Sequence, residues 1–368
     1  MSRILVMSSD PVQTYVKNGM TYEYCDGYFN PDGYFDEVFC LHPRGENRTH
    51  GRVHYIQAEP RKFHSIIKEI KPDVVRAYDG FKCADWACVS RVKNIPVVVS
   101  VHDTNPQLIH KSLQYADAII CMAEAVKSAV CKKVSVDKEK IFVMPNRIDV
   151  DLFSKREDKD FFDRLDRLYG EGKHILHVGR KVEQKNIDTL IKAMTMLPEE
   201  YSAVFVGSGE ATPFKELAQK LHVEHRCHFI ESVRREDLPY YYSWCDCMCT
   251  PSRWEGFGYV FIEAAACESA IVTSDIGPMN EYLTDSKDAL LVADYENPAK
   301  IAEACLKACS NTKEIMEIKR AARQVGLRFE KSKVDKQEIA IYQKVMEKGS
   351  SNRYCFDLKT IKRTILYK

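Results

Sequence analysis

The sequence TPSRWEGFGYVFIEAAAC, at residues 250–267, places a turn, two glycines and a long apolar segment directly after another apolar run. Pro251 and Ser252 are typical turn residues. Glu255 follows, then a Gly-Phe-Gly triplet at 256–258, and the alanine-rich remainder predicts a helix. Strand, loop and helix in this order are typical of proteins that alternate strands with helices.

The predicted loop and helix have the chemistry of a site for phosphates and hydroxyl groups. Glycines at the start of a helix let a ligand approach the backbone closely, and the helix N-terminus favours an anion. Glu255 and Glu263 could accept hydrogen bonds from ligand hydroxyls. An isolated pair of glutamates is more often only solvated, but the glycines, the aromatic residue between them and the upstream strand favour a site. Together the residues indicate a ligand such as a sugar nucleotide.

The composition is that of an ordinary globular protein, with room for about two domains in 368 residues. Lysine and arginine number 54 and acidic residues 53, and this balance argues against a nucleic-acid-binding protein. No segment reaches the roughly 18 apolar residues of a membrane-spanning helix. The N-terminal run MSRILVMSSD is too short for a signal peptide, so we expect a cytoplasmic protein.

Fourteen cysteines are scattered through the chain without a C-x-x-C pair. Cys245, Cys247 and Cys249 alternate, so they would share one face of a strand. No further histidine or cysteine lies nearby at ligand spacing. We therefore expect buried structural thiols here rather than a metal site.

Short apolar runs alternate with helical patterns along most of the chain. Strands are predicted at residues 4–7, 53–56, 73–76, 96–101, 118–121 and 141–144, and again at 174–179, 202–207, 228–230, 246–249, 270–273 and 290–292. Helices are predicted at residues 61–70, 83–93, 107–115, 124–132, 187–196, 213–222, 235–244, 259–267 and 298–310, with a lysine-rich helical stretch up to 348. This alternation predicts an α/β fold of two doubly wound parallel-sheet domains that face a cleft.

The predicted domain boundaries follow from a charged linker at residues 154–173. We expect a first domain at residues 1–160, a second at 161–348 and a C-terminal helix at 349–368. That helix would pack back on the first domain. Its lysines stand beside apolar side chains, which leaves contact with anionic lipid open as an alternative.

Further motifs follow predicted strands, where ligands of such sheets bind. Arg180 and Lys185, five residues apart in VGRKVEQKN, suit a diphosphate and would stabilise one as a leaving group. Gly207 lies in VGSGE, a weak nucleotide signal that a tight turn explains better. His102, in VSVHDTN, could hydrogen-bond a sugar hydroxyl. Ordinary surface charges and a structural histidine are the alternatives to these roles.

In this order the motifs resemble those of the retaining glycosyltransferases of family four, which have the two-domain GT-B architecture. The resemblance covers most of the second domain and part of the first. It includes Gly179-Arg180 with Lys185-Asn186, Glu255-Gly256-Phe257-Gly258 with Glu263-Ala264, Pro145-Asn146 with Asp149 and Phe153, residues 275–281, and Val101-His102-Asp103.

The resemblance implies an acceptor-side Rossmann-like first domain and a second one that binds the nucleotide sugar. Arg180 and Lys185 would hold the diphosphate, Glu255 would contact the donor sugar, and His102 would complete the catalytic group. Glu263 would bind the ribose. The other implied donor-binding positions are Val233 at the base, Gly207, Gly256, Phe257, Gly258 and Tyr259. Family members need no metal ion and no cofactor besides the co-substrate, for which we expect a UDP or GDP sugar.

The sequence therefore predicts a metal-independent hexosyltransferase of glycan biosynthesis. Its acceptor would be a glycan or a lipid-linked molecule, nucleic acid would not be a partner, and peripheral membrane contact stays open. The first strand is followed by SSDPVQTYVKNGMTYEY instead of the family's Gly-Gly loop, so the resemblance does not predict the acceptor. Arg147 also departs from the family, because glycine is common at this position. A sugar-nucleotide epimerase and a non-catalytic nucleotide-binding module are alternatives, although the second would require a damaged site.

Overall fold

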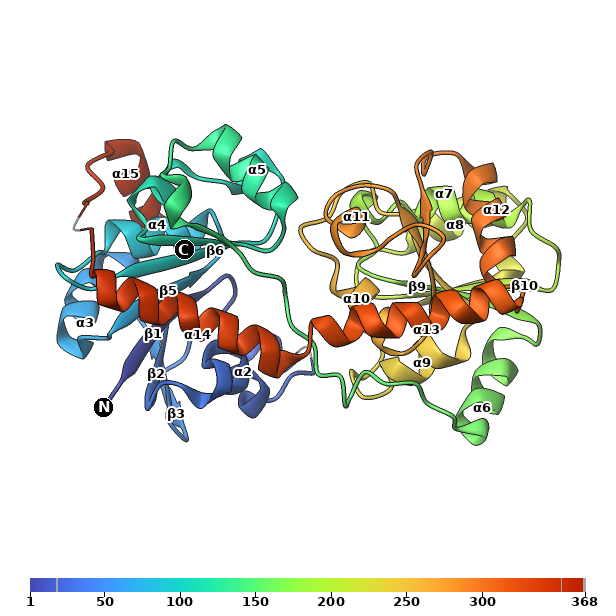
Figure 1. Cartoon of the computed structure of the whole chain (residues 1–368), viewed down its shortest axis with the longest axis horizontal. Coiled ribbons are helices and arrows are strands. Elements are labelled where there is room, and N and C mark those ends of the chain that lie inside the picture. Colours follow the sequence, from blue (N-terminus) through green and yellow to red (C-terminus); the bar gives the residue numbers. More distant parts are fainter. Residues whose placement is uncertain (18, 352, 367–368) are drawn as a thin grey trace. The chain divides into compact units, whose positions relative to one another are not determined.

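The computed structural model describes residues 1–17, 19–351 and 353–366 (Figure 1). The chain divides into two compact units, Met1–Pro145 with Ser332–Lys368, and Asn146–Lys331. Each unit is built on one sheet, and the predicted α/β fold with two doubly wound parallel sheets is confirmed. Within the described ranges, no helix is both long and apolar enough to cross a membrane.

The sheet of the first unit has eight strands in the order β3-β4-β2-β1-β5-β6-β7-β8. The strands are β1 (Arg3–Ser8), β2 (Glu37–His42), β3 (Arg48–His50), β4 (Val53–Gln57), β5 (Val74–Tyr78), β6 (Val97–Val101), β7 (Ala118–Cys121) and β8 (Ile141–Val143). All neighbours pair in parallel except β3 with β4. The interior strand β6, VVVSV, is buried along its whole length, as expected for a strand covered on both faces.

Helices of the first unit come from both ends of the chain. They are α1 (Val12–Lys17), α2 (Tyr22–Phe29), α3 (Phe63–Ile70), α4 (Lys82–Val89), α5 (Glu124–Lys133), α14 (Lys331–Lys348) and α15 (Leu358–Leu366). Short 3₁₀ helices are η1 (Pro31–Gly33), η2 (Pro60–Lys62), η3 (Pro106–Leu108), η4 (Lys111–Tyr115) and η5 (Lys138–Lys140). The helix predicted at residues 107–115 is therefore wrong, because the chain forms two separate 3₁₀ segments there.

Helix α14, which the sequence placed with the second domain, belongs to the first unit (Figure 1). Arg76 on β5 is 1% exposed, and its Nε donates to Glu338 Oε1 at 3.1 Å and to Tyr342 Oη at 3.0 Å on α14. A buried guanidinium requires such partners. The lysine-rich pattern of α14 predicts a helix but not the sheet that receives its buried face, which explains the difference.

Helix α15 packs against α4 in the same unit. Asp85 on α4 is fully buried, and Arg363 on α15 donates to both of its oxygens, from Nε at 2.7 Å and from Nη2 at 3.0 Å. His110 Nδ1 lies 3.0 Å from the same carboxylate. A bidentate guanidinium contact of this kind fixes both position and orientation of the helix.

The sheet of the second unit has six parallel strands in the order β11-β10-β9-β12-β13-β14. They are β9 (Lys173–Val178), β10 (Tyr201–Val206), β11 (Cys227–Ile230), β12 (Cys247–Thr250), β13 (Ala270–Ser274) and β14 (Leu290–Val292). The helices are α6 (Lys159–Tyr169), η6 (Glu183–Lys185), α7 (Ile187–Met194), α8 (Thr212–Lys220), η7 (Glu224–Arg226), α9 (Leu238–Trp244), α10 (Tyr259–Ala266), α11 (Met279–Tyr282), α12 (Pro298–Ala308) and α13 (Lys313–Arg328).

The strand order of this sheet reverses between β9 and β12. The chain runs outward from β9 to β11 on one side, then crosses to β12 and runs outward to β14 on the other. Ligands of doubly wound sheets bind at such a switch point, outside the carboxyl ends of the two strands. The loops after β9 and β12 are therefore the first place to look for a site.

Candidate functional site

Both principal motifs of the sequence lie at this switch point. Gly179 and Arg180 directly follow β9, and residues 251–258 follow β12 and lead into α10. The two loops are tied together at several points. Gln184 Nε2 donates to Trp254 O at 2.9 Å, and the Arg253 backbone amide donates to Gln184 O at 2.8 Å. The loops thus form one structural unit across the sheet.

A buried ion pair joins the two loops. Lys185 Nζ lies 2.5 Å from Glu255 Oε1, and the two residues are only 8% and 5% exposed. Ser252 Oγ donates to the same carboxylate oxygen at 2.7 Å. Such a pair is held by good geometry and by further hydrogen bonds, because both charges have left water. The sequence singled out both residues but not their contact.

The backbone of Lys185 also contacts the sheet, through His177. His177 on β9 is fully buried, and its Nε2 lies 3.4 Å from Lys185 O. Burial, with a smaller contribution from the Lys185 charge, lowers the pKa of His177 to about 3, so the imidazole is neutral. The next residue, Asn186, has a left-handed backbone with φ of 53° and starts α7. This turn directs the Lys185 side chain towards the β12 loop.

Arg253 is a scaffold residue that the sequence did not single out. Its Nη1 donates to Glu183 O at 2.7 Å, its Nη2 to Asp188 Oδ1 at 3.0 Å, and its Nε to Glu296 Oε1 at 2.8 Å. One guanidinium thereby joins the β12 loop to η6, to α7 and to the segment after β14. These contacts hold the loop that carries Lys185. Its position two residues before Glu255, in the same motif, is the sequence feature that could have identified Arg253.

Arg180 points to solvent and is exposed, in contrast to Lys185. Its Nη2 lies 3.4 Å from Gln184 Oε1, which is a long contact. Lys185 forms an ion pair with Glu255, whereas the guanidinium of Arg180 is exposed to solvent.

The mouth of α10 is formed by residues 256–259. Gly258 has φ of 85°, and a Cβ at this position would lie 2.4 Å from the Phe261 ring, so only glycine fits. The Phe257 side chain is buried, with its ring centroid 5.2 Å from that of Tyr282. Tyr282 Oη donates to Phe257 O at 2.8 Å. The buried Phe257 ring leaves its backbone as the part that a ligand could reach, while Gly256 is buried and Tyr259 half-buried.

Glu263 lies in the second turn of α10, where it is partly buried. Tyr242 Oη donates to its Oε2 at 3.1 Å. Burial raises the pKa of Glu263 to about 7, and the charge of Arg235 and the Tyr242 hydrogen bond partly oppose this rise. The carboxyl therefore changes charge near neutral pH unless a ligand intervenes.

Gly207 and Val233 follow β10 and β11. Gly207 allows a close crossing, because a Cβ there would lie 2.0 Å from Gly179 O. Lys181, which the sequence did not single out, is 5% exposed and donates from Nζ to Gly207 O and, at 2.7 Å, to Ile230 O. It joins the carboxyl ends of both strands and so fixes the start of the loop that carries the half-buried Val233.

His102 lies in the first unit, directly after β6. Its Nε2 is 2.7 Å from Ser100 Oγ, and its ring stacks on Tyr78 with centroids 6.3 Å apart. Burial, followed by the charge of Arg76, lowers the pKa of His102 to about 4. The imidazole is therefore neutral at physiological pH and suited to hydrogen bonding rather than to carrying a positive charge.

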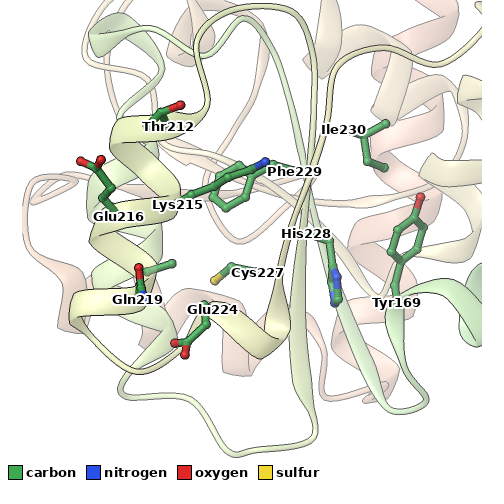
Figure 2. Close-up of a pocket in the computed structure, with 11 residues that line it drawn as sticks. Tyr169, Thr212, Lys215, Glu216, Gln219, Glu224, Cys227, His228, Phe229 and Ile230 are labelled. Carbon is green, nitrogen blue, oxygen red and sulfur yellow. The ribbon is translucent and has the colours of Figure 1, made fainter.

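A pocket of about 550 Å³ lies elsewhere in the second unit, between α8 and β11 (Figure 2). Thr212, Lys215, Glu216 and Gln219 line it from α8, and Cys227 to Ile230 line it from the strand. The residues that line it include none of the predicted site residues. As for metals, the described part of the chain holds no group of three or more histidine, cysteine or acidic side chains that could bind an ion. Cys245, Cys247 and Cys249 are buried free thiols.

Comparisons of the sequence with known proteins identify a family of glycosyltransferases. A family model described as glycosyl transferases group 1 matches residues 158–325, and one described as glycosyltransferase family 4 matches residues 18–152. An uncharacterized glycosyltransferase of Methanocaldococcus jannaschii is 27% identical over 303 residues, which are 74% of this chain and 77% of the relative. The O-antigen chain mannosyltransferase RfbU of Salmonella typhimurium is 27% identical over 194 residues, or 52% of this chain and 50% of the relative.

Solved structures show the same fold. HepE of Anabaena in complex with UDP and glucose aligns with a TM-score of 0.77 at 18% identity and covers 94% of this chain and 100% of that one. WaaG, a glycosyltransferase involved in lipopolysaccharide biosynthesis, aligns with a TM-score of 0.71 at 15% identity, covering 93% and 99%.

Proposed function

Because the chain belongs to the group 1, family 4 glycosyltransferases and shares their GT-B fold, we propose that it transfers a hexose from a nucleotide-diphosphate sugar with retained anomeric configuration. The acceptor in this proposal is a glycan or a lipid-linked molecule. In this proposal the protein acts in the cytoplasm.

The Lys185–Glu255 pair is the observation that best supports the proposal. Each charge is satisfied by the other, at the mouth of α10. A donor would supply a partner for both: its diphosphate would take Lys185, and a sugar hydroxyl would donate to Glu255. After this exchange no buried charge would be left unpaired.

The proposed transfer begins when the bond between the anomeric carbon and the diphosphate breaks. Negative charge then accumulates on the leaving diphosphate, and Lys185 and Arg180 would stabilise it. The backbone amides at the start of α10 add a positive dipole end. Because two cations supply this charge, we propose that transfer requires no metal ion. Glu255 would hold the donor sugar in position for the acceptor hydroxyl, whose oxygen bonds to the anomeric carbon while its proton passes to the leaving diphosphate.

We place the nucleoside of the donor next to the diphosphate, between α10 and the loop after β11. Glu263 would accept hydrogen bonds from the ribose hydroxyls, and the backbone at Val233 would contact the base. Gly207, whose lack of a side chain lets its loop lie against the backbone of Gly179, follows β10, which lies between β11 and β12 in the strand order. UDP is our first choice of nucleotide because HepE is described in complex with UDP and glucose.

A donor screen followed by product analysis tests the proposal. Thermal unfolding is measured with UDP, GDP, ADP and TDP sugars, and the stabilising donor is then incubated with and without candidate acceptors, in excess EDTA. We expect free nucleoside diphosphate to appear and the hexose to move to the acceptor. A changed sugar from donor alone would instead identify an epimerase, and activity that EDTA abolishes and Mn²⁺ restores would refute the role of the two cations.

A further inference from the structure

Helix α15 buries two threonines against the protein and leaves most of its apolar side chains, and Phe356 just before it, in solvent; Ile361 is half-buried. Thr360 and Thr364, one turn apart, are 3% and 1% exposed, and Arg363 is held by the buried Asp85. The large apolar side chains point outward: Phe356, Leu358, Ile365 and Leu366 are 81%, 79%, 52% and 66% exposed. This is the reverse of the usual arrangement, in which apolar side chains of a surface helix face the core.

The outward residues form one continuous face. In a helix of 3.6 residues per turn, positions 358, 362, 365 and 366 lie on the same side, with 359 at its edge. Lys359 and Lys362 are both exposed on this side. We call Phe356, Leu358, Lys359, Lys362, Ile365 and Leu366 the α15 surface.

The charges around the α15 surface are mainly positive. The exposed Asp357 is a negative charge here, since hydrogen bonds from Thr360 and the Lys359 amide lower its pKa. Glu59, beside η2, is also exposed, but it is paired with Arg61. The η2 segment, which contacts α15, carries the exposed Lys62. Upstream, burial lowers the pKa of Lys140, and the nearby positive charge of Arg353 lowers it further. The apolar face is therefore set in a basic environment.

We propose that the α15 surface docks on the anionic surface of a lipid bilayer. At nine residues the helix is too short to span the apolar core, but it can lie in the interface. Leu358, Ile365 and Leu366 would enter the boundary with the acyl chains while the lysines reach the head groups. A second copy of the chain fits less well, because a two-fold axis through this surface would bring lysines against lysines. These observations stand independently of the proposed transferase activity.

Co-sedimentation of the full chain with vesicles tests the proposal. Vesicles of phosphatidylcholine are compared with vesicles that also contain phosphatidylglycerol. Two variants change the surface: Leu358→Ser with Ile365→Ser and Leu366→Ser, and Lys359→Gln with Lys362→Gln. Matched controls change exposed residues of the second unit: Met196→Ser with Leu306→Ser and Met316→Ser, and Lys215→Gln with Lys220→Gln.

We expect the wild type and both controls to bind the anionic vesicles, and both α15 variants to bind roughly tenfold more weakly or worse. All proteins should unfold at similar temperatures, since the changed side chains face solvent. Ile365→Trp should show blue-shifted emission on anionic vesicles only. Wild-type binding that is absent, equal on neutral vesicles or unchanged in the variants would overturn the proposal. So would a dimer in light scattering that the triple α15 variant converts to a monomer.

Discussion

The Lys185–Glu255 pair shows how a single contact can link stability to the proposed chemistry. Both side chains are buried, so removing one partner leaves the other charge without compensation. That loss typically costs about 3–5 kcal/mol when no polar group remains. Glutamine at position 255 keeps the shape and an acceptor oxygen, so it separates the charge from the packing.

Glu255→Gln should lower kcat strongly and leave the affinity for the nucleoside diphosphate unchanged or increased. The reason is that Lys185 no longer has a competing carboxylate and is available to the diphosphate. Calorimetry with the nucleoside diphosphate and steady-state kinetics measure the two effects. Glu183→Gln, an exposed change in the neighbouring loop, serves as the control. A loss of diphosphate affinity of more than about tenfold in Glu255→Gln would contradict the roles given to the pair.

Glu263 should give both stability and nucleotide binding a dependence on pH. Its pKa in the folded chain is about 7, above the ordinary value of 4.5, so the unfolded chain releases this proton first as pH rises. The stabilising contribution of the protonated form is therefore complete at low pH and is lost as pH rises through about 7. After allowance for partial exposure we expect a loss on the order of 1–2 kcal/mol.

Glu263→Gln should remove that part of the pH dependence, which thermal unfolding between about pH 5 and 8 would detect. In the wild type, nucleoside diphosphate should bind more tightly above pH 7 than below it, because a carboxylate accepts hydroxyl hydrogen bonds better than a carboxylic acid. The comparison of wild type with variant cancels the titration of the nucleotide itself. Parallel pH profiles for the two proteins would show that Glu263 does not bind the ribose.

The sequence indicated which residues to consider as site candidates, but it did not predict the contacts between them. Lys185 and Glu255 are 70 residues apart, and they meet only because β9 and β12 are neighbours in the sheet. Periodicity predicts the strands and leaves their order open. Lys181 and Arg253 escaped notice for the same reason, since their partners are carbonyl and carboxylate oxygens on other loops.

At the scale of elements, prediction succeeded where apolar runs were long and failed where they were short or mixed. All six strands of the second unit were expected within about one residue of their observed ends. In the first unit β2 and β3 were missed, because β3 is exposed and β2 follows a glycine- and tyrosine-rich stretch. That stretch forms α1 and α2, which the sequence pattern did not resolve.

Gly258 is the position where one side chain would disturb the whole start of α10. Its φ of 85° strains any other residue, and a Cβ would also meet the Phe261 ring at 2.4 Å. Gly258→Ala should destabilise the protein by about 2–4 kcal/mol and weaken nucleoside diphosphate binding. Gly170→Ala is a matched control, since φ is 91° there and nothing lies within 4 Å of the added Cβ. It should cost only about 1 kcal/mol and leave binding intact.

Denaturant unfolding and calorimetry on both variants separate the two causes. Equal losses would mean that backbone strain alone explains the requirement for glycine. Wild-type binding by a folded Gly258→Ala protein would exclude the mouth of α10 from the nucleotide site.

At the scale of the whole molecule, the two units differ in how the chain builds them. The second unit is one continuous segment whose ends meet: Ile148 N donates to Phe329 O at 2.8 Å, and Lys331 N donates to Ile148 O at 2.9 Å. The first unit needs two segments from opposite ends of the chain. Sequence periodicity cannot show this, because it identifies helices without showing which sheet they cover.

Fragments of the chain should therefore behave differently. Residues 146–331 contain a complete sheet and both loops of the switch point, so this fragment should unfold cooperatively and bind the nucleoside diphosphate within about tenfold of the full chain, without transferring sugar. Residues 1–145 alone should not fold, because Arg76 would lose Glu338 and Tyr342 and the buried Asp85 would lose Arg363. Each stranded charge costs about 3–5 kcal/mol, against a typical total stability of about 5–15 kcal/mol.

Joining residues 332–368 to residue 145 through a flexible linker should restore a cooperative transition, because the missing partners return in the same chain. Circular dichroism and thermal unfolding decide the outcome for each fragment. If residues 1–145 fold alone, the buried contacts with α14 and α15 are not needed for this unit. If residues 146–331 fold but bind no nucleotide, the donor site requires residues outside this unit, and the assignment of the nucleotide to the β9–β12 switch point is incomplete.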